Sequence, residues 1–284
     1  MMVFSPAKIN LFLEILSKQN NGFHRINSLM CICNIGDKIE VSKSSNYELK
    51  ISGKFKDQLI GKKNIVDDVF FKVKKKFKIK ENIKVKIIKQ LPISSGIGGG
   101  SSNAATLFGI IEFLFNLSIG ESEKHKLLNS FGSDVPFCYN RKPSIVTGTG
   151  NKIVPAKSFH EFYVLLINPL IQISTKEVFE KKNNIFTESP TEIKPKIDRK
   201  EFITVLNRAS NDLEIIVSNK YPEVKKIIDF LKNETNSVLS RMSGSGGTCF
   251  GIFNNFHDLK LAYNKLIETK KKWWFKKGKI LNSI

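Results

Sequence analysis

Acidic residues are scarce in this 284-residue chain. It holds 26 aspartates and glutamates against 46 lysines and arginines, so the formal net charge is +20. Such a balance suits anionic partners (nucleotides, nucleic acids or acidic lipids) and draws polyanions towards the protein. Lysine-rich codon bias is an equally open explanation for the charge.

Cysteine and histidine are also rare, with four residues of each type. No two cysteines form a C-x-x-C pair and the histidines are scattered, which argues against a zinc site or a disulfide framework. We therefore expect no metal ligands among the side chains and a reducing, cytoplasmic location.

Long hydrophobic runs are missing as well. No stretch of eighteen apolar residues occurs, so we expect no membrane-spanning helix. The apolar N-terminus is interrupted by Lys8, Asn10 and Glu14, which excludes a secretory signal. Apolar residues nevertheless make up 41% of the chain, enough for a sizeable core in one large or two ordinary domains.

A glycine-serine stretch dominates what is present. Residues 91–103 read LPISSGIGGGSSN, between a predicted strand with alternating Ile83, Val85 and Ile87 and a predicted helix that begins near residue 104. Ser101, Ser102 or Asn103 is expected to cap that helix. A glycine loop that leads into a helix N-terminus favours a bound phosphate, because free N–H groups and the helix dipole both attract anions.

Two familiar phosphate-binding motifs do not fit this loop. No Gly-Lys-Ser/Thr ends it, so it is not a Walker A motif, and Ser101 replaces the third glycine of a dinucleotide fingerprint. A flexible turn with capping serines remains the alternative interpretation.

Two isolated polar residues accompany the loop. Lys8 and Asn10 share one face of a predicted strand over residues 3–16, and Asp134 lies in GSDVPF, where Pro136 is expected to keep Val135 out of a helix. Taken alone, a strand lysine favours a solvated edge charge and the aspartate a cap or turn former.

The remaining pattern alternates strands and helices. Helices are predicted over residues 64–77, 121–131, 201–217 and 224–232, a hairpin over 145–154, strands over 163–168 and 248–253, and a polar loop over 181–200. A second glycine-serine loop, SRMSGSGG, covers residues 240–247. The tail KKWWFKKGKI is expected to be a terminal strand that buries Trp273 or Trp274, although basic residues mixed with aromatics also occur in nucleic-acid and membrane contacts.

Together, two small-residue loops, one lysine and one aspartate are the minimum set for phosphoryl transfer to a hydroxyl. Spacing alone does not show that they meet.

The segments PAKINLFLEIL, LPISSGIGGGSSNAA, GSDVPF and SRMSGSGGTCFGIF resemble the signature regions of the galactokinase, homoserine kinase, mevalonate kinase and phosphomevalonate kinase (GHMP) superfamily. Within it, SPAKINLFL followed by NGFH is similar to members that phosphorylate 4-diphosphocytidyl-2-C-methyl-D-erythritol at its 2-hydroxyl, in non-mevalonate isoprenoid biosynthesis. The resemblance covers the chain almost end to end.

This resemblance implies a two-domain α/β (α+β) fold. Residues 1–155 would be a ribosomal S5 domain 2-like nucleotide-binding domain and residues 156–284 a ferredoxin-like domain, with the active site in the cleft between them. ATP and Mg²⁺ would be required. The partner would be the small-molecule alcohol, with no nucleic acid or membrane, and the enzyme would be a monomer or weak homodimer.

The resemblance also implies roles for single residues. Lys8 and Asp134 would be the catalytic pair, and Asn64 would contact adenine. The ATP phosphates would be wrapped by Pro92, Ile93, Ser94, Ser95, Gly96, Ile97, Gly98, Gly99, Gly100, Ser101 and Ser102. The alcohol would be held by Asn10, His24 and Thr175, its cytosine would stack on Phe23 and Phe179, and the loop with Gly244 and Gly246 would lie near the diphosphate.

Two departures from the superfamily pattern are visible. The common Asp-Gly-Tyr-His turn is Asn21-Gly22-Phe23-His24 here, so a tyrosine hydroxyl is absent, and the glycine loop opens with Ser94-Ser95 instead of glycine or alanine.

Two other functions remain as alternatives. One is a GHMP kinase of homoserine, a sugar or mevalonate, and the other is a basic RNA-binding module without catalysis.

Overall fold

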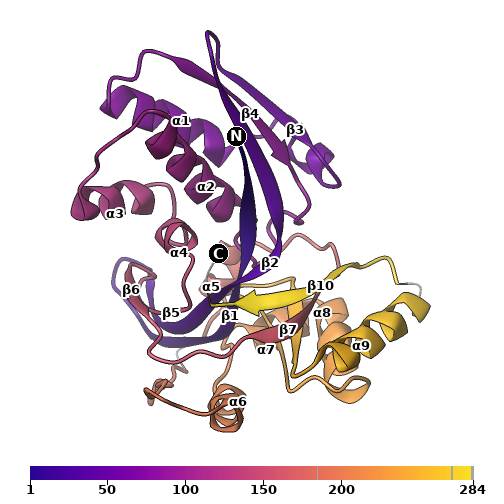
Figure 1. Cartoon of the computed structure of the whole chain (residues 1–284). Helices are drawn as coiled ribbons and strands as arrows, with labels where there is room; N and C mark the ends of the chain where they lie inside the picture. Colours follow the sequence, from indigo (N-terminus) through magenta and orange to yellow (C-terminus); the bar gives the residue numbers. More distant parts are fainter. Residues whose placement is uncertain (184, 270, 283–284) are drawn as a thin grey trace. The chain divides into compact units, whose positions relative to one another are not determined.

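Figure 1 shows a computed structural model of the chain, which describes residues 1–183, 185–269 and 271–282. The chain divides into two units. Unit 1 comprises Met1–Ala7, Gly36–Ile93 and Gly98–Asn140, and unit 2 comprises Lys8–Ile35, Ser94–Ile97 and Arg141–Ile284. The long strands β1 (Met2–Lys18) and β2 (His24–Ser44) contribute residues to both units. The predicted domain division into residues 1–155 and 156–284 stays a prediction.

Unit 1 packs helices against one face of a small sheet (Figure 1). β4 (Asn82–Ile88) pairs antiparallel with the end of β2 and parallel with β3 (Glu48–Ser52). The helical elements are η1 (Lys56–Leu59), α1 (Ile65–Lys76), α2 (Gly99–Leu114), α3 (Glu121–Asn129) and α4 (Val135–Asn140). As the alternation predicts, Ile83, Val85 and Ile87 are buried and the lysines between them are exposed.

The helices of unit 1 follow from their side-chain patterns. In α1, Val66, Val69, Phe70 and Val73 form one buried stripe, and Asn64 caps the first turn by accepting a hydrogen bond from the Val66 N–H. α2 buries residues on nearly every side, as its largely apolar sequence requires. The predicted helices over 64–77 and 121–131 are therefore confirmed, although the second ends at Asn129.

Two local predictions in unit 1 are wrong. No serine or asparagine side chain caps α2, which begins at Gly99 after Gly98 in a left-handed conformation. Val135 is helical, because Pro136 occupies the first turn of α4, where a missing N–H leaves no intrahelical bond unmade.

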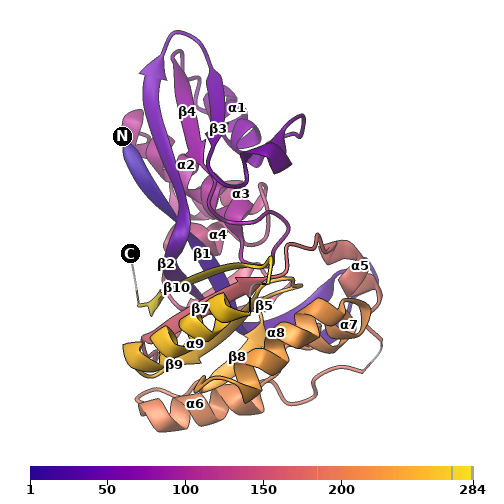
Figure 2. The ribbon, with the colours of Figure 1, turned by 90° about the vertical axis from the view of Figure 1, so that its right-hand side faces the viewer.

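Unit 2 is built on an antiparallel sheet with the strand order β2-β10-β7-β9-β8. Its strands are β7 (Phe162–Asn168), β8 (Leu239–Met242), β9 (Cys249–Phe253) and β10 (Trp274–Leu281), while the hairpin of β5 (Ser144–Gly148) and β6 (Lys152–Pro155) pairs with β2. Figure 2 shows α8 (Pro222–Asn233) and α9 (Phe256–Glu268) on one face of this sheet. The predicted hairpin, the strands over 163–168 and 248–253 and the terminal strand are confirmed, with Trp274 only 1% exposed.

The predicted helix over residues 201–217 is two helices, α6 (Arg199–Arg208) and α7 (Glu214–Lys220). Asn211 interrupts it. Its side-chain amide donates to the carbonyl oxygens of Met242 and Gly244 at 2.8 Å each, and its Oδ1 accepts from the Leu213 N–H at 3.0 Å. An asparagine that bonds backbone groups in this way competes with a continuous helix. The sequence pattern also missed α9 and the short α5 (Thr175–Glu180).

The polar loop predicted over 181–200 is confirmed for most of its described part, and contacts with β1 hold it. The Thr187 N–H donates to the Ile15 carbonyl and the Thr191 N–H to Glu14 Oε2, both at 2.9 Å. Glu14 is 3% exposed and also accepts from Asn27 Nδ2 at 2.9 Å. A buried carboxylate thus pins this loop to the sheet.

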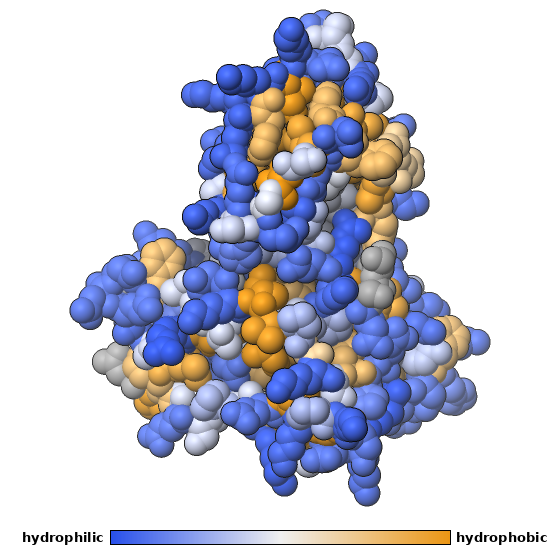
Figure 3. Space-filling view, turned by 60° about the vertical axis from the view of Figure 1, so that its left-hand side comes forward, coloured by the Kyte–Doolittle hydropathy of each residue, from blue (hydrophilic) through white to orange (hydrophobic). Residues whose placement is uncertain are grey.

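The surface is largely polar. On the face shown in Figure 3, hydrophilic residues predominate and apolar residues gather in smaller patches. No helix of the described residues combines the length and apolarity that crossing a bilayer requires.

Arg241 on β8 ties several elements of unit 2 together. It is 7% exposed, and its guanidinium donates to the carbonyl oxygens of Leu11 at 2.6 Å, Leu206 at 3.0 Å and Ala209 at 2.6 Å. The last two lie at the C-terminal end of α6, where carbonyl groups lack intrahelical donors.

We expect Arg241→Met to lower the free energy of unfolding by about 3 kcal/mol or more, because three buried acceptors lose their donor. Urea denaturation measures this loss. Arg208→Met, at an exposed position at the end of α6, is the control and should change stability by less than about 0.5 kcal/mol. Equal stability of the two variants would show that these carbonyl contacts are unimportant.

Candidate active site

The two glycine-serine loops interlock within unit 2. Ser243 Oγ donates to the Gly96 carbonyl at 3.1 Å, and the Thr248 N–H donates to the Ser95 carbonyl at 3.1 Å. Gly96 has φ +76°, and a Cβ atom added there would lie 2.3 Å from the Ser243 carbonyl oxygen and 2.8 Å from that of Gly246. Only glycine fits such a position, so the close approach of the loops depends on it.

Lys8 and Asn10 on β1 lie against these loops. The Lys8 N–H donates to the Ile97 carbonyl at 3.0 Å, and the Asn10 N–H donates to Ser243 Oγ at 3.2 Å. The Lys8 ammonium donates to Asn10 Oδ1 at 2.6 Å, and a Cβ atom on Gly244 would lie 3.4 Å from Lys8 Nζ. Both side chains therefore face the second loop.

The burial of Lys8 and Asn10 decides between the two interpretations of Lys8 that the sequence left open. Lys8 is 5% and Asn10 1% exposed, so the interpretation of Lys8 as a solvated edge charge is wrong. The Asn10 amide also donates to Ser28 Oγ at 2.9 Å, which fixes its orientation. A buried ammonium held in this way suits the stabilisation of negative charge that develops on a bound group.

Thr175 extends this cluster. It is the first residue of α5, whose N-terminus is capped by Ser174, and its Oγ1 lies 2.7 Å from Ser245 Oγ. The predicted substrate residue Thr175 thus contacts the loop that contains Gly244 and Gly246.

His24 and Phe179 form a second feature of unit 2. Their ring centroids are 5.3 Å apart at an interplanar angle of 44°. His24 is 7% exposed, and its buried Nε2 atom has no hydrogen-bond partner among the described residues. Burial, and then the charges of Lys18 and Lys182, lower the pKa of His24 below 6.5, which favours a neutral imidazole. Phe23 is 63% exposed, so its ring is open to a ligand.

The predicted residues at the start of α2 belong to unit 1. Gly98 precedes α2, and Gly99, Gly100 and Ser101 form its first turn, where backbone N–H groups have no intrahelical acceptor. A Cβ atom on Gly100 would meet no atom within 4 Å, so the backbone there is open to a close ligand. This geometry fits an anion.

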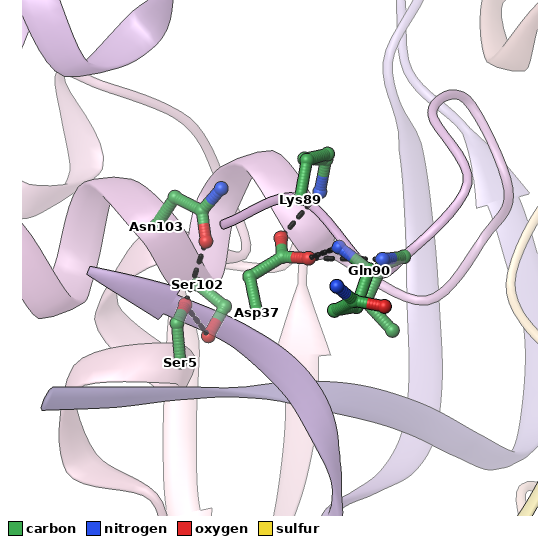
Figure 4. A network of polar contacts seen from close by, with 7 residues as sticks. Ser5, Asp37, Lys89, Gln90, Ser102 and Asn103 are labelled. Atoms are coloured by element: carbon green, nitrogen blue, oxygen red, sulfur yellow. Dashed lines mark hydrogen bonds and ion pairs between the residues drawn. The ribbon is translucent and has the colours of Figure 1, made fainter. Parts of the chain in front are cut away.

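Two side chains at the start of α2 have structural partners instead (Figure 4). The Ser5 hydroxyl lies 2.9 Å from Ser102 Oγ and 2.7 Å from Asn103 Oδ1. Ser102 and Asn103 therefore join α2 to β1, and the Ser102 N–H donates to the Gly98 carbonyl at 2.8 Å.

Asn64 and Asp134 each mark a helix start in unit 1. Asn64 Oδ1 accepts from the Val66 N–H at 3.1 Å, which leaves the amide NH₂ as its donor for a ligand. The Asp134 carbonyl accepts from the Cys138 N–H at 3.0 Å in the first turn of α4. Pro92 and Ile93 complete the unit 1 part of the loop, and Ser94–Ile97 lie in unit 2.

The sequence reasoning missed a buried ion pair at the base of the loop. Asp37 is fully buried and Lys89 3% exposed, and the two side chains form an ion pair (Figure 4). The alternation of the strand could have revealed this pair. Lys89 continues the series Ile83, Val85 and Ile87, whose side chains are buried, and a charge is unexpected in that series.

The described residues contain no group of three or more histidine, cysteine, aspartate or glutamate side chains arranged to hold a metal ion. All four cysteines are buried, and burial raises the pKa values of Cys31, Cys33 and Cys249.

Comparison with known proteins places the chain in a family. Residues 64–142 match the GHMP kinases N terminal domain, and residues 194–272 match GHMP kinases C terminal. A protein of Finegoldia magna named 4-diphosphocytidyl-2-C-methyl-D-erythritol kinase is 32% identical over 278 residues, which cover 97% of this chain and 98% of the relative. The chain belongs to this family of GHMP kinases. The resemblance seen in the sequence is thereby confirmed.

Solved structures of the GHMP superfamily confirm the two-domain fold. A crystal structure of 4-(cytidine 5'-diphospho)-2C-methyl-D-erythritol kinase has a TM-score of 0.79 at 21% identity and covers 99% of both chains. Homoserine kinase from Cytophaga hutchinsonii has a TM-score of 0.72 at 14% identity, covering 100% of this chain and 95% of the other. Since kinases of different alcohols share the fold, the fold alone does not identify the acceptor.

We expect Gly96→Ala to separate the two loops of unit 2. The positive φ alone should lower the free energy of unfolding by roughly 1–3 kcal/mol, and the clash with Ser243 adds to this loss. Gly100→Ala should remain within about 1 kcal/mol of the wild type, because its Cβ meets no neighbour. Chemical denaturation compares the two, and equal losses would contradict the role of Gly96.

His24 should make stability depend on pH. Its folded pKa lies below the value of 6.5 for an unperturbed histidine, so the unfolded chain binds the proton first as the pH falls. The free energy of unfolding should therefore decrease from about pH 7 downwards until the pH falls below the lowered folded pKa. His24→Gln should show a shallower decrease in denaturation measured from pH 7.5 to 5.5, with His257→Gln as the matched exposed variant. Identical slopes for wild type and His24→Gln would contradict this prediction.

Proposed function

We propose that the protein transfers the γ-phosphoryl group of ATP, taken as its magnesium complex, to the 2-hydroxyl of 4-diphosphocytidyl-2-C-methyl-D-erythritol. This is a step of non-mevalonate isoprenoid precursor biosynthesis. The observation that carries the proposal is the buried Lys8 ammonium, which is held by Asn10 and faces the second glycine-serine loop, where Gly96 of the first loop makes contact. Family membership supports it, because relatives that match nearly the whole chain bear the name of this kinase.

The proposed chemistry assigns one role to each catalytic residue. The 2-hydroxyl oxygen attacks the γ-phosphorus, the bond to the β–γ bridging oxygen breaks, and ADP leaves. Asp134 orients the hydroxyl and accepts its proton, while Lys8 stabilises the charge on the attacking oxygen and the transferred group. Because such a transition state is loose in most analyses, positioning contributes more than the strength of the base.

Nucleotide binding is assigned to the glycine loop and the start of α2. The backbone N–H groups of Gly99–Ser101 suit phosphate oxygens, and the open space beside Gly100 permits close approach. The Asn64 amide NH₂ is assigned to adenine. Magnesium would be held by the ATP phosphates and would neutralise part of their charge.

The cytidine end is assigned to the aromatic pair of unit 2. Phe179 and the exposed Phe23 offer ring faces for stacking on cytosine, and the unpartnered Nε2 of a neutral His24 offers one hydrogen bond. Asn10 and Thr175 contribute polar groups nearer the second loop. Stacking on a nucleobase would have no purpose in a kinase of homoserine or mevalonate, whose acceptors contain no base.

The biological setting follows from the same assignment. A small-molecule substrate accounts for the phosphate-binding loops without a nucleic-acid partner, and buried free thiols suit the reducing cytoplasm.

A substrate panel tests the proposal. Phosphate transfer from [γ-³²P]ATP is measured to 4-diphosphocytidyl-2-C-methyl-D-erythritol, methylerythritol phosphate, homoserine, mevalonate and galactose. We expect transfer to the cytidylylated alcohol alone. Preferred transfer to another alcohol would establish a different GHMP kinase. No transfer to any alcohol, with salt-sensitive RNA affinity, would favour an RNA-binding protein.

Lys8→Ala and Asp134→Asn should each reduce kcat by roughly 10²–10⁴-fold while changing ATP affinity little, because each group acts on charge that develops in the transition state. Steady-state kinetics and nucleotide titration measure the two effects. Lys84→Ala, at an exposed position in β4, and Asp229→Asn, whose side chain in α8 is 46% exposed, are the controls. Near-normal turnover in either test variant would remove that residue from the chemistry.

A further inference from the structure

Asp37 and Lys89 form a deeply buried ion pair in unit 1, with 0% and 3% of their side-chain surfaces exposed. Desolvation of two charges offsets most of their mutual attraction, so a buried pair contributes little net stability compared with apolar residues of similar volume. Its position at the base of the glycine loop points to another purpose.

The carboxylate of Asp37 holds the entrance of the loop. Asp37 Oδ1 accepts from the backbone N–H groups of Gln90 at 2.7 Å and Leu91 at 2.9 Å, while Oδ2 pairs with Lys89 (Figure 4). The Lys89 backbone is itself fixed, because its N–H donates to the Ser52 carbonyl at 2.7 Å. These hydrogen bonds therefore fix the direction in which the chain leaves β4.

The ammonium of Lys89 lies at the exit of the loop. A Cβ atom added to Gly99, the first residue of α2, would lie 2.9 Å from Lys89 Nζ. The Lys89 ammonium therefore lies against the backbone of Gly99 at the start of α2. One ion pair thus touches both ends of the segment Leu91–Gly99.

We propose that Asp37 and Lys89 are positioning residues that hold both ends of the segment Leu91–Gly99 in its nucleotide-binding conformation before ATP arrives. This inference rests on the proposed function, because it assigns the segment to ATP. Neither side chain needs to touch the nucleotide. Holding the loop in advance reduces the ordering that binding would otherwise require.

A pair of variants separates positioning from stability. Lys89→Met leaves a buried carboxylate unpaired and should lower both Tm and ATP affinity. The double variant Asp37→Asn/Lys89→Met removes both charges. The amide oxygen of the introduced side chain still accepts the two N–H groups, so Tm should recover in part, although the amide NH₂ replaces an oxygen that paired with Lys89.

Nucleotide binding should not recover in the double variant. We expect its KM for ATP to stay about tenfold above that of the wild type, with the KM for the cytidylylated alcohol within twofold. Recovery of both Tm and the KM for ATP would show that the pair has only a structural role and would overturn the proposal. An equal rise in the KM for ATP and the KM for the cytidylylated alcohol would overturn it as well.

Lys124→Met is the matched control. Lys124 forms another shielded ion pair of unit 1, with Glu112 at 2.8 Å and side-chain exposures of 13% and 17%. This variant should lower Tm without changing the KM for ATP. A rise in that KM equal to the rise in the double variant would show that any loss of stability in unit 1 impairs nucleotide binding.

Amide hydrogen exchange without substrates tests the pair independently of activity. In the double variant, exchange should accelerate at Leu91, Ile93, Gly98 and Gly99 more than elsewhere in unit 1, and uniform acceleration of unit 1 would contradict the proposal. If the wild type phosphorylates no alcohol, the proposed function fails, whereas the exchange pattern still decides whether the pair holds the loop.

Discussion

The close approach of Gly96 to the loop of Ser243 is the constraint on which the arrangement of unit 2 depends. A side chain at Gly96 would meet the backbone oxygens of Ser243 and Gly246, so the two loops can touch only through glycine. Lys8 and Asn10 hydrogen-bond the same two loops from β1. One backbone contact therefore fixes the surroundings of a buried ammonium.

Several polar groups in this protein are buried with dedicated partners. Lys8 has Asn10, Arg241 has three carbonyl groups, and Glu14 has Asn27 and Thr191. Each satisfies the general requirement that a buried charge be hydrogen-bonded. His24 differs, because its Nε2 atom is buried without a partner among the described residues. An unsatisfied buried group of this kind is expected where a ligand completes the site.

Much of the local structure was predictable from side-chain patterns. Alternation at Ile83, Val85 and Ile87 predicted β4, and the stripe that begins after Asn64 predicted α1. Predictions failed where a tertiary contact overrode a local preference. Ser102 and Asn103 bond to Ser5 instead of capping α2, and Asn211 divides a predicted helix by bonding to carbonyl groups of the second loop.

The sequence alone determined the family, many of the strands and helices and the candidates for the site, since motif order and hydrophobic period are properties of the chain itself. Only the tertiary structure decided that Lys8 is buried, that Phe179 lies against His24 and that Asp37 pairs with Lys89. The members of these pairs, and the groups around Lys8, lie far apart in the sequence or show no distinctive sequence pattern. The energy of a buried charge depends on its neighbours in space, which no local pattern records.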